Sequence, residues 1–189
     1  MDTQEEQGRT LLLQIADGSE IALEEFYRRY ESRIYAFVLS RLNNVHAAGD
    51  ILNEVMWAIW CGAGKFKGQS KIVTWIFGIA HHKILDYFRA QGRHEAEDLD
   101  PDIPEISDRD VVSKMERFQD SEHIRHALGE LDEKHRQVLH LAFFEDLSGK
   151  EISEIFGCPE ATVRTRIHYA KKALKQQLAK DLEQRTPIQ

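Results

Sequence analysis

The sequence predicts an all-α protein made of two small helical domains, which an acidic flexible linker joins. Three observations lead to this prediction. Apolar residues recur at spacings of three and four over most of the chain, a stretch near its middle is rich in acids and proline, and a helix-turn-helix pattern follows that stretch. We expect a first domain over residues 1–94, a linker over 95–110, a second domain over 111–182 and a frayed tail over 183–189.

The composition is that of an ordinary globular protein. The chain has 189 residues, of which 42% are hydrophobic and 30% charged. No apolar run approaches the roughly 20 residues that cross a bilayer, and the first ten residues are too polar for a signal peptide. We therefore expect a cytoplasmic protein with no direct membrane insertion. Cys61 and Cys158 lie far apart without a CxxC pattern, which predicts neither a disulfide framework nor a cysteine-rich zinc site.

The net charge of −7 is unevenly distributed along the chain. Residues 95–123 carry 11 acidic and 3 basic side chains, whereas residues 1–94 carry 11 of each and residues 124–189 carry 10 acidic and 11 basic ones. The acid is thus concentrated around the predicted linker. An acidic total does not exclude a nucleic-acid partner, because basic clusters remain on both sides of that stretch.

The first domain is expected to contain four helices. A short apolar helix over residues 9–16 ends before Gly18, and Ser19 is a candidate N-cap for a long amphipathic helix. Asn43 and Asn44 break that helix after Leu42. A third helix is expected over about 47–60 and a fourth over about 71–91, with these apolar positions: Ile51, Leu52, Val55, Met56 and Ile59, then Ile72, Trp75, Ile76, Ile79 and Ala80.

Polar groups of the first domain form two candidate surfaces and a loop. The third helix carries Asp50, Asn53 and Glu54 opposite its apolar side, where a plain solvated face is the commoner interpretation. The loop over 61–70 combines lysines with Phe66, a composition that can hold single-stranded nucleic acid, although a lone aromatic more often packs onto the core. One mostly basic face is expected on the fourth helix: His82, Asp86, Arg89 and Arg93.

In the second domain, Val111, Met115 and Phe118 resume a helical pattern, and Asp132 is a candidate cap for the next helix. The helix-turn-helix then follows. Ser148 and Glu151 have the spacing of a capping box, Gly157 ends the first of its helices, and Pro159 suits the start of the second.

The second helix of this motif is predicted to separate an apolar seam from a basic face. The seam consists of Val163, Ile167, Ala170, Leu174 and Leu178. Residues 160–180 contain six Lys or Arg and one acid. Hydroxyl, guanidinium and imidazole groups near the start of the helix suit base edges, and the lysines suit phosphates. The residues predicted on or at the edges of this face are Thr162, Thr165, Arg166, His168, Tyr169 and Lys172.

Taken in order, these segments resemble the sigma factors of bacterial RNA polymerase, in the extracytoplasmic-function (ECF) group of the sigma-70 family. The resemblance covers roughly residues 19–180. ALEEFYRRYESRIYAFVLSRL is similar to the start of the first sigma domain, and DILNEVMWAIW to the helix that docks on the polymerase. KFKGQSKIVTWIFGIAHHKILDYFRAQGR is similar to the segment that opens and reads the minus-10 element. The stretch from LGELDEKHRQ to HYAKKAL is similar to the domain that reads the minus-35 element.

The resemblance implies partners and a role for each candidate residue. Core RNA polymerase, through its β′ clamp and β flap, and promoter DNA are the implied partners, with an anti-sigma factor as inhibitor and candidate membrane tether. Asp50, Asn53 and Glu54 would contact the polymerase. The minus-10 element would contact Lys65, Phe66, Lys67, Gly68, Gln69, Ser70, His82, Arg89 and Arg93, with Trp75 supporting the loop. The minus-35 element would contact Thr162, Arg164, Thr165, Arg166, His168, Tyr169 and Lys172.

The function expected on this basis is promoter-specific initiation by a dissociable, non-catalytic subunit that is a monomer when free. The alternative is a homodimeric helix-turn-helix repressor or activator, although no apolar helix is left over for a dimer interface. A hydrolase or metalloenzyme is poorly supported, since His81 and His82 are adjacent and point about 100° apart on a helix. His123 and His126 could share a helical face, but surface histidines are commoner. No metal and no cofactor is expected.

Overall fold

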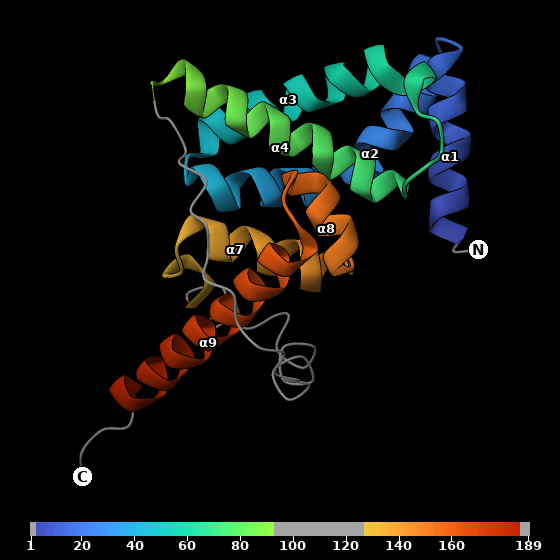
Figure 1. Ribbon diagram of the computed structural model, residues 1–189. Helices are drawn as coiled ribbons and strands as arrows, with labels where there is room; N and C mark the ends of the chain where they lie inside the picture. The colour runs from blue at the N-terminus through green and yellow to red at the C-terminus, as the bar shows by residue number, and fades with distance from the viewer. Residues whose placement is uncertain (1–2, 93–126, 186–189) are drawn as a thin grey trace. The chain divides into compact units, whose positions relative to one another are not determined.

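The computed structural model describes residues 3–92 and 127–185, with side chains to residue 180, and every regular element within these ranges is helical (Figure 1). The prediction of an all-α chain is therefore confirmed. The chain divides into two compact units, formed mostly by residues 1–97 and by residues 98–189. The predicted linker, Arg93 and the expected helical stretch over 111–126 lie outside the described residues. None of the described helices combines the length and apolar character that crossing a bilayer requires.

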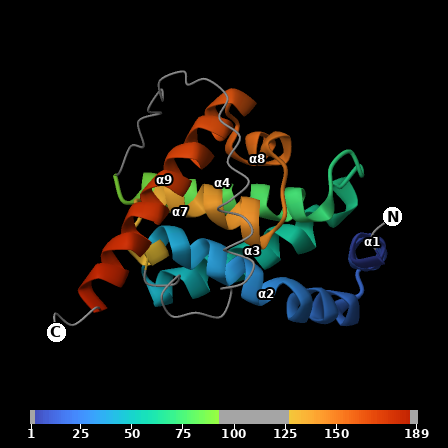
Figure 2. The same cartoon turned by 90° about the horizontal axis from the view of Figure 1, so that it is seen from below.

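The first unit consists of α1 (Thr3–Ala16), α2 (Glu20–Leu42), α3 (Val45–Gly62), a 3₁₀ turn (Ala63–Lys65) and α4 (Ile72–Ala90). Helix α1 is longer than the predicted 9–16, because its first two turns are polar and lack the apolar spacing that the prediction used. Figures 1 and 2 show α2, α3 and α4 running alongside one another, with α1 across one end beside the α3–α4 connection.

The helix boundaries in this unit follow local chemistry. Ser19 caps α2 by accepting a hydrogen bond from the Ala22 N–H at 3.2 Å, as predicted. Asn43 then adopts the left-handed conformation, with a φ of 48°, and ends α2. Asn44 begins α3 at once, since its side-chain oxygen accepts from the Ala47 N–H at 3.1 Å. Two adjacent asparagines thus end one helix and begin the next.

The core of the first unit is apolar and contains several aromatic rings. All five apolar positions predicted for α3 are buried. In α4, Trp75 and Ile79 are only half-buried, whereas Phe77, Ile84 and Phe88, which the prediction left out, are buried. The Phe77 ring meets that of Phe37 at a centroid distance of 5.1 Å, nearly edge to face.

The later described range, residues 127–185, contains α7 (Glu133–Leu139), a π-helical turn (His140–Phe144), α8 (Gly149–Phe156) and α9 (Glu160–Arg185). Asp132 caps α7 as predicted, by accepting from the His135 N–H at 2.9 Å. The capping box at α8 is also confirmed. Its Ser148 N–H donates to Glu151 at 2.8 Å, and the Glu151 N–H donates to the Ser148 hydroxyl at 3.3 Å.

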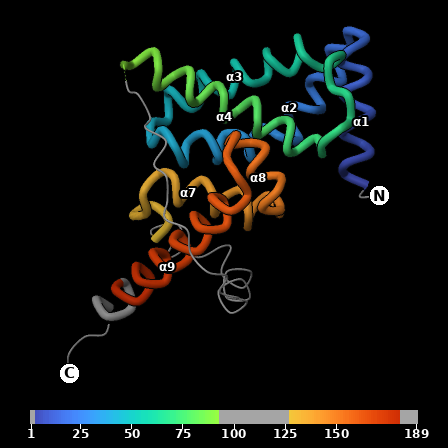
Figure 3. The backbone as a smooth tube through the Cα atoms, in the orientation of Figure 1, coloured from blue at the N-terminus to red at the C-terminus, as the bar shows by residue number. Residues whose placement is uncertain are grey.

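Helices α8 and α9 form the predicted helix-turn-helix, which Figure 3 shows as a short helix, a tight turn and a long helix. Gly157 in the turn has a φ of 65°, a conformation that glycine adopts without strain. Helix α9 continues to Arg185, three residues into the tail that was expected to fray. No proline or glycine interrupts residues 160–185, so nothing in the sequence ends the helix earlier.

Candidate nucleic-acid interface

The loop between α3 and α4 places its predicted residues around one aromatic ring. Phe66 is half-buried, and its ring lies 5.2 Å from that of Trp75 on α4, between centroids. Lys65 and Lys67 on either side of it are exposed. Phe66 is therefore neither fully exposed nor part of the buried core. A partly exposed aromatic ring between two exposed lysines suits a base and the phosphates beside it.

Gly68 gives this loop its shape. Its φ of 68° lies in the left-handed region, and a Cβ at this position would lie 2.9 Å from the Arg9 guanidinium nitrogen Nη1. The backbone conformation therefore favours glycine here, and a larger residue would also have to displace the end of the Arg9 side chain. Gln69 is exposed and Ser70 half-buried, with the Ser70 carbonyl oxygen accepting a hydrogen bond from Arg9 at 3.3 Å.

The predicted polar face of α4 begins at His82, ten positions after the start of the helix at Ile72. His82 and Arg89 are both exposed, and Arg89 lies 2.9 Å from Asp86 in an exposed ion pair that leaves the guanidinium accessible. From Ile72 to Arg89 the helix rises about 25 Å at 1.5 Å per residue. That length corresponds to about seven nucleotides of one strand at 3.4 Å each.

The polar patch on α3 has two features that the sequence pattern did not reveal. Asp50, Asn53 and Glu54 are exposed, and Glu54 lies 3.1 Å from Lys83 of α4. Trp57, three residues beyond Glu54, lies on the same side of the helix and is 67% exposed. An exposed tryptophan beside acidic and amide groups is typical of a protein-binding surface. The spacing 50, 53, 54 and 57 was the signal that could have identified it.

In α9, most residues of the predicted DNA-facing side are accessible. Arg164 and Lys172 are exposed, and Thr162, Arg166, His168 and Tyr169 are half-buried. Arg164 lies 3.8 Å from Glu160, one turn earlier. The apolar seam is buried at Val163, Ala170 and Leu174 but only partly covered at Ile167 and Leu178.

Thr165 departs from the exposed face that was predicted for it, since it is only 7% exposed. Its hydroxyl donates to the Ala161 carbonyl oxygen of the preceding turn at 3.0 Å. A threonine satisfied in this way has used its donor, so any base contact would use its oxygen as acceptor. A helical wheel places Thr165 opposite the apolar seam, but it cannot show whether a side chain on that side is covered.

The part of the chain that the structure describes contains no group of three or more His, Cys, Asp or Glu side chains placed to hold a metal ion. His123 and His126 lie outside that part. Cys61 and Cys158 are free cysteines, exposed and half-buried respectively.

Comparison with known protein families decides between the remaining functions. The sigma-70 region 2 model matches residues 26–94, and the sigma-70 region 4 model matches residues 121–174. Together the two models cover more than half of the chain, in the order of the family. The chain belongs to the sigma-70 family, in its ECF group. A helix-turn-helix repressor is not favoured, because the chain matches sigma-70 region 2 in addition to the region that contains the helix-turn-helix.

Individual relatives agree with this assignment. The sigma factor is 28% identical over 165 residues to RNA polymerase sigma factor YlaC of Bacillus subtilis, covering 86% of this chain and 95% of that one. It is 28% identical over 163 residues to ECF sigma factor RpoE of Cereibacter sphaeroides, covering 85% and 88%. It is 29% identical over 177 residues to ECF sigma factor SigW of Bacillus subtilis, covering 87% and 93%.

Two solved structures share the fold. CnrH, solved in complex with the cytosolic domain of CnrY, superposes with a TM-score of 0.61 at 20% identity, covering 95% of this chain and 99% of that one. RpoE of Bartonella quintana, solved with the anti-sigma factor NepR, gives a TM-score of 0.59 at 19% identity, covering 84% and 99%. Sigma factors are transcription initiation factors.

Proposed function

We propose that this sigma factor binds core RNA polymerase through the α3 patch and directs it to promoters by reading two DNA elements. The loop over 65–70 and the α4 face would read the minus-10 element, and the start of α9 would read the minus-35 element. The observation that carries the proposal is that the region 2 match contains the first two surfaces and the region 4 match contains the third.

The chemistry of each surface supports its proposed partner. Phe66 with flanking lysines suits an unstacked base and the phosphates beside it, because stacking on an aromatic ring is favourable for every base. Arginine and threonine at the start of a helix suit base edges in the major groove. Two such contacts are each weak, and a polymerase that holds both modules on one duplex would raise their combined affinity through effective concentration.

Run-off transcription with purified core polymerase on a library of promoter templates tests the proposal. We expect specific transcripts only when sigma factor and core are both present. Arg166→Ala should lower discrimination at one minus-35 position by about 1–3 kcal/mol, the contribution of one good base contact. Gln176→Ala, at an exposed position further along α9, is the matched control. Tight and specific promoter binding by the sigma factor alone would contradict the proposal.

Binding to the polymerase is tested separately. Asp50→Ala and Glu54→Ala should weaken the binding of core, whereas Glu25→Ala, an exposed acid on α2, should leave it unchanged. Trp57→Ala should have the largest effect, since tryptophan side chains dominate many interfaces. Equal binding of core by all four variants would remove the α3 patch from the proposal.

Control by an anti-sigma factor is part of the proposal. Both similar solved structures are complexes, one with the cytosolic domain of CnrY and one with the anti-sigma factor NepR. An inhibitor that covers the α3 patch would compete with the polymerase for Trp57. Co-purification from the native host before and after stress should show a partner that exchanges with core polymerase. The natural chain and Trp57→Ala are purified side by side, and the variant should retain less of that partner. A partner retained equally by both forms would place the inhibitor elsewhere.

A further inference from the structure

Helix α4 begins without a cap of its own. Lys71 at its N-cap position makes no side-chain capping hydrogen bond. The Ile72 N–H instead donates to the carboxylate of Glu5 on α1, with oxygen distances of 3.1 and 3.2 Å, from 67 positions away in the chain. A carboxylate here satisfies an otherwise orphan donor and favours the positive end of the helix dipole. The start of α4, where the loop ends, is thus held by α1.

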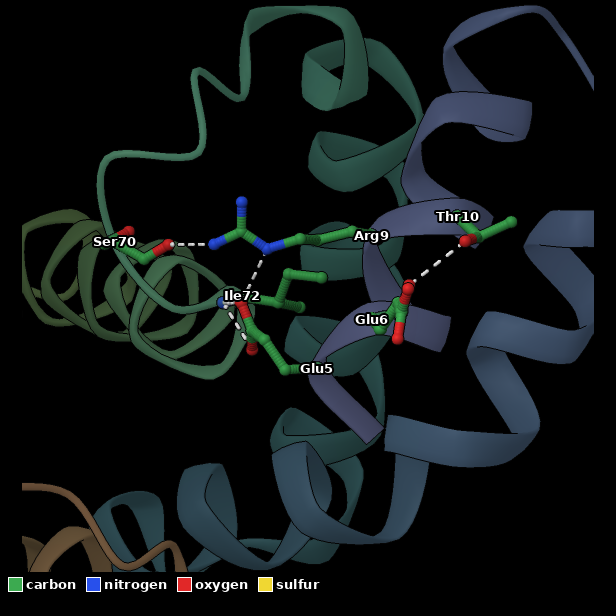
Figure 4. Close-up of polar contacts among 6 residues, drawn as sticks. All are labelled: Glu5, Glu6, Arg9, Thr10, Ser70 and Ile72. Atoms are coloured by element: carbon green, nitrogen blue, oxygen red, sulfur yellow. Dashed lines mark hydrogen bonds and ion pairs between the residues drawn. The ribbon is translucent and has the colours of Figure 1, made fainter. Parts of the chain in front are cut away.

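Arg9, one turn after Glu5, joins the same carboxylate to the loop (Figure 4). Its Nε donates to Glu5 at 3.0 Å, and its Nη2 donates to the Ser70 carbonyl oxygen at 3.3 Å. Its guanidinium carbon lies 5.7 Å from the centre of the Phe66 ring, within range of a cation–π interaction. Its Nη1 occupies the space that a side chain on Gly68 would need. One guanidinium therefore contacts three positions of the loop.

These contacts restrict the one aromatic group that the loop presents. Phe66 lies against Trp75 and Arg9, with centroid distances of 5.2 and 5.7 Å. Without Arg9, the backbone of the loop would keep a hydrogen bond from Phe66 to the Ala63 carbonyl and lose its link to α1 at Ser70. A loop that is freer in the unbound protein must lose that conformational freedom when it binds DNA. The lost entropy lowers the affinity of the loop for the minus-10 element and weakens discrimination.

We propose that the Glu5–Arg9 pair is a positioning device for reading the minus-10 element. It sets the Phe66 ring before DNA arrives, and it acts through the loop without contacting a base. The pair lies in α1, before the region 2 match begins at residue 26. The inference rests on the proposed function of the loop, and the experiment below separates the failure of one from the failure of the other.

The experiment measures run-off transcription with core polymerase on paired templates that carry either a base or an abasic site at one position of the minus-10 element, because stacking on Phe66 favours any base over none. Arg9→Ala should reduce the ratio between the two templates by about tenfold, the effect of losing one charge-assisted hydrogen bond. Arg9→Lys keeps the charge but not the planar fork, so it should rescue little. Arg28→Ala is the matched control, because Arg28 and Glu24 form the same kind of i,i+4 pair on α2 with both side chains exposed.

Two further measurements exclude a merely structural explanation. Discrimination at a minus-35 base and binding of core should be the same for Arg9→Ala and the natural chain, whereas general unfolding would reduce both. In a Phe66→Ala background, adding Arg9→Ala should change the minus-10 ratio no further, because the arginine acts through that ring. The proposal is overturned if Arg9→Ala lowers the minus-10 ratio by the same factor in the Phe66→Ala background as in the natural chain.

The remaining outcomes are distinct. If Phe66→Ala abolishes minus-10 discrimination and Arg9→Ala leaves it intact, the positioning role is wrong and the function of the loop stands. If Phe66→Ala itself has no effect on the minus-10 ratio, the proposed function of the loop fails. If Arg9→Lys restores the full ratio, charge alone suffices and the fork geometry is not used.

Discussion

The two candidate DNA-reading surfaces owe their geometry to different causes. The surface on α9 is part of one continuous helix whose start follows a local turn at Gly157 and Pro159. The loop over 66–70 has irregular backbone and is held by Arg9, which binds Ser70 from 61 positions away, beside Glu5, which binds Ile72 from 67 positions away. A helical surface is therefore specified by residues near it in sequence, and a loop surface by residues near it only in space.

The capping of α8 and α4 shows the same difference. Glu151 caps α8 from three residues away, and Glu5 caps α4 from 67 residues away. Both carboxylates satisfy backbone N–H groups at a helix start. Only the first belongs to a motif that can be found by scanning a sequence.

The largest expected effect comes from Gly8→Ala, which tests whether the close approach of α1 is needed. A Cβ on Gly8 would lie 2.6 Å from the Tyr30 hydroxyl oxygen and 2.9 Å from Ile72 Cδ1. Such overpacking should lower the free energy of unfolding by about 1–3 kcal/mol. Urea denaturation gives that value, and minus-10 discrimination should fall with it. Unchanged stability would show that α1 can shift without cost.

A pair of glycine substitutions comes next, and it compares the two regions directly. Gly68 and Gly157 have similar φ values of 68° and 65°, so Ala at either should cost about 1–2 kcal/mol of backbone strain. Only at Gly68 would the new Cβ also displace Arg9, since nothing lies within 4 Å of that position at Gly157. We expect Gly68→Ala to be the more destabilising in thermal unfolding. Equal losses would mean that Arg9 moves aside freely.

Ser148→Ala tests the local cap. Loss of the hydroxyl leaves the Glu151 N–H without its acceptor and should cost about 1 kcal/mol, as other N-cap substitutions do. The effect should be confined to minus-35 recognition and to the melting of the second unit. Hydrogen exchange of α8 amides measures it. Faster exchange in α1 or α4 as well would contradict the local character of this cap.

The smallest expected effect is on the pH dependence of stability, and it involves Tyr30, whose hydroxyl lies close to Gly8. Burial raises the pKa of the Tyr30 hydroxyl, and the nearby charges of Arg33 and Arg29 only partly oppose this. The folded state therefore holds this proton more tightly than the unfolded state. The contribution of the protonated Tyr30 hydroxyl to the free energy of unfolding is complete below pH 10 and is lost as the pH rises further. Denaturation between pH 9 and pH 11 should show a shallower decline for Tyr30→Phe than for the natural chain.

Much of the fold could be predicted because its signals are local. Ser19, Asp132 and the Ser148–Glu151 box were identified from spacing alone, and each makes the expected capping bond. The buried side of α3 followed from periodicity. The first turns of α1 were missed, because polar helix residues lack that period. The low exposure of Thr165 was also missed, because helical periodicity assigns a residue to a side of the helix but does not show what covers that side.

The sequence by itself determined most of the helices, the local caps at Ser19, Asp132 and Ser148, and the membership of a family, because hydrophobic spacing and local capping act over a few residues. Only the tertiary structure decided that Glu5 caps α4 and that Arg9 lies over Phe66. The physical reason is the range of the interactions. A carboxylate or a guanidinium acts on whatever lies within a few ångströms, and folding brings together groups that are distant along the chain.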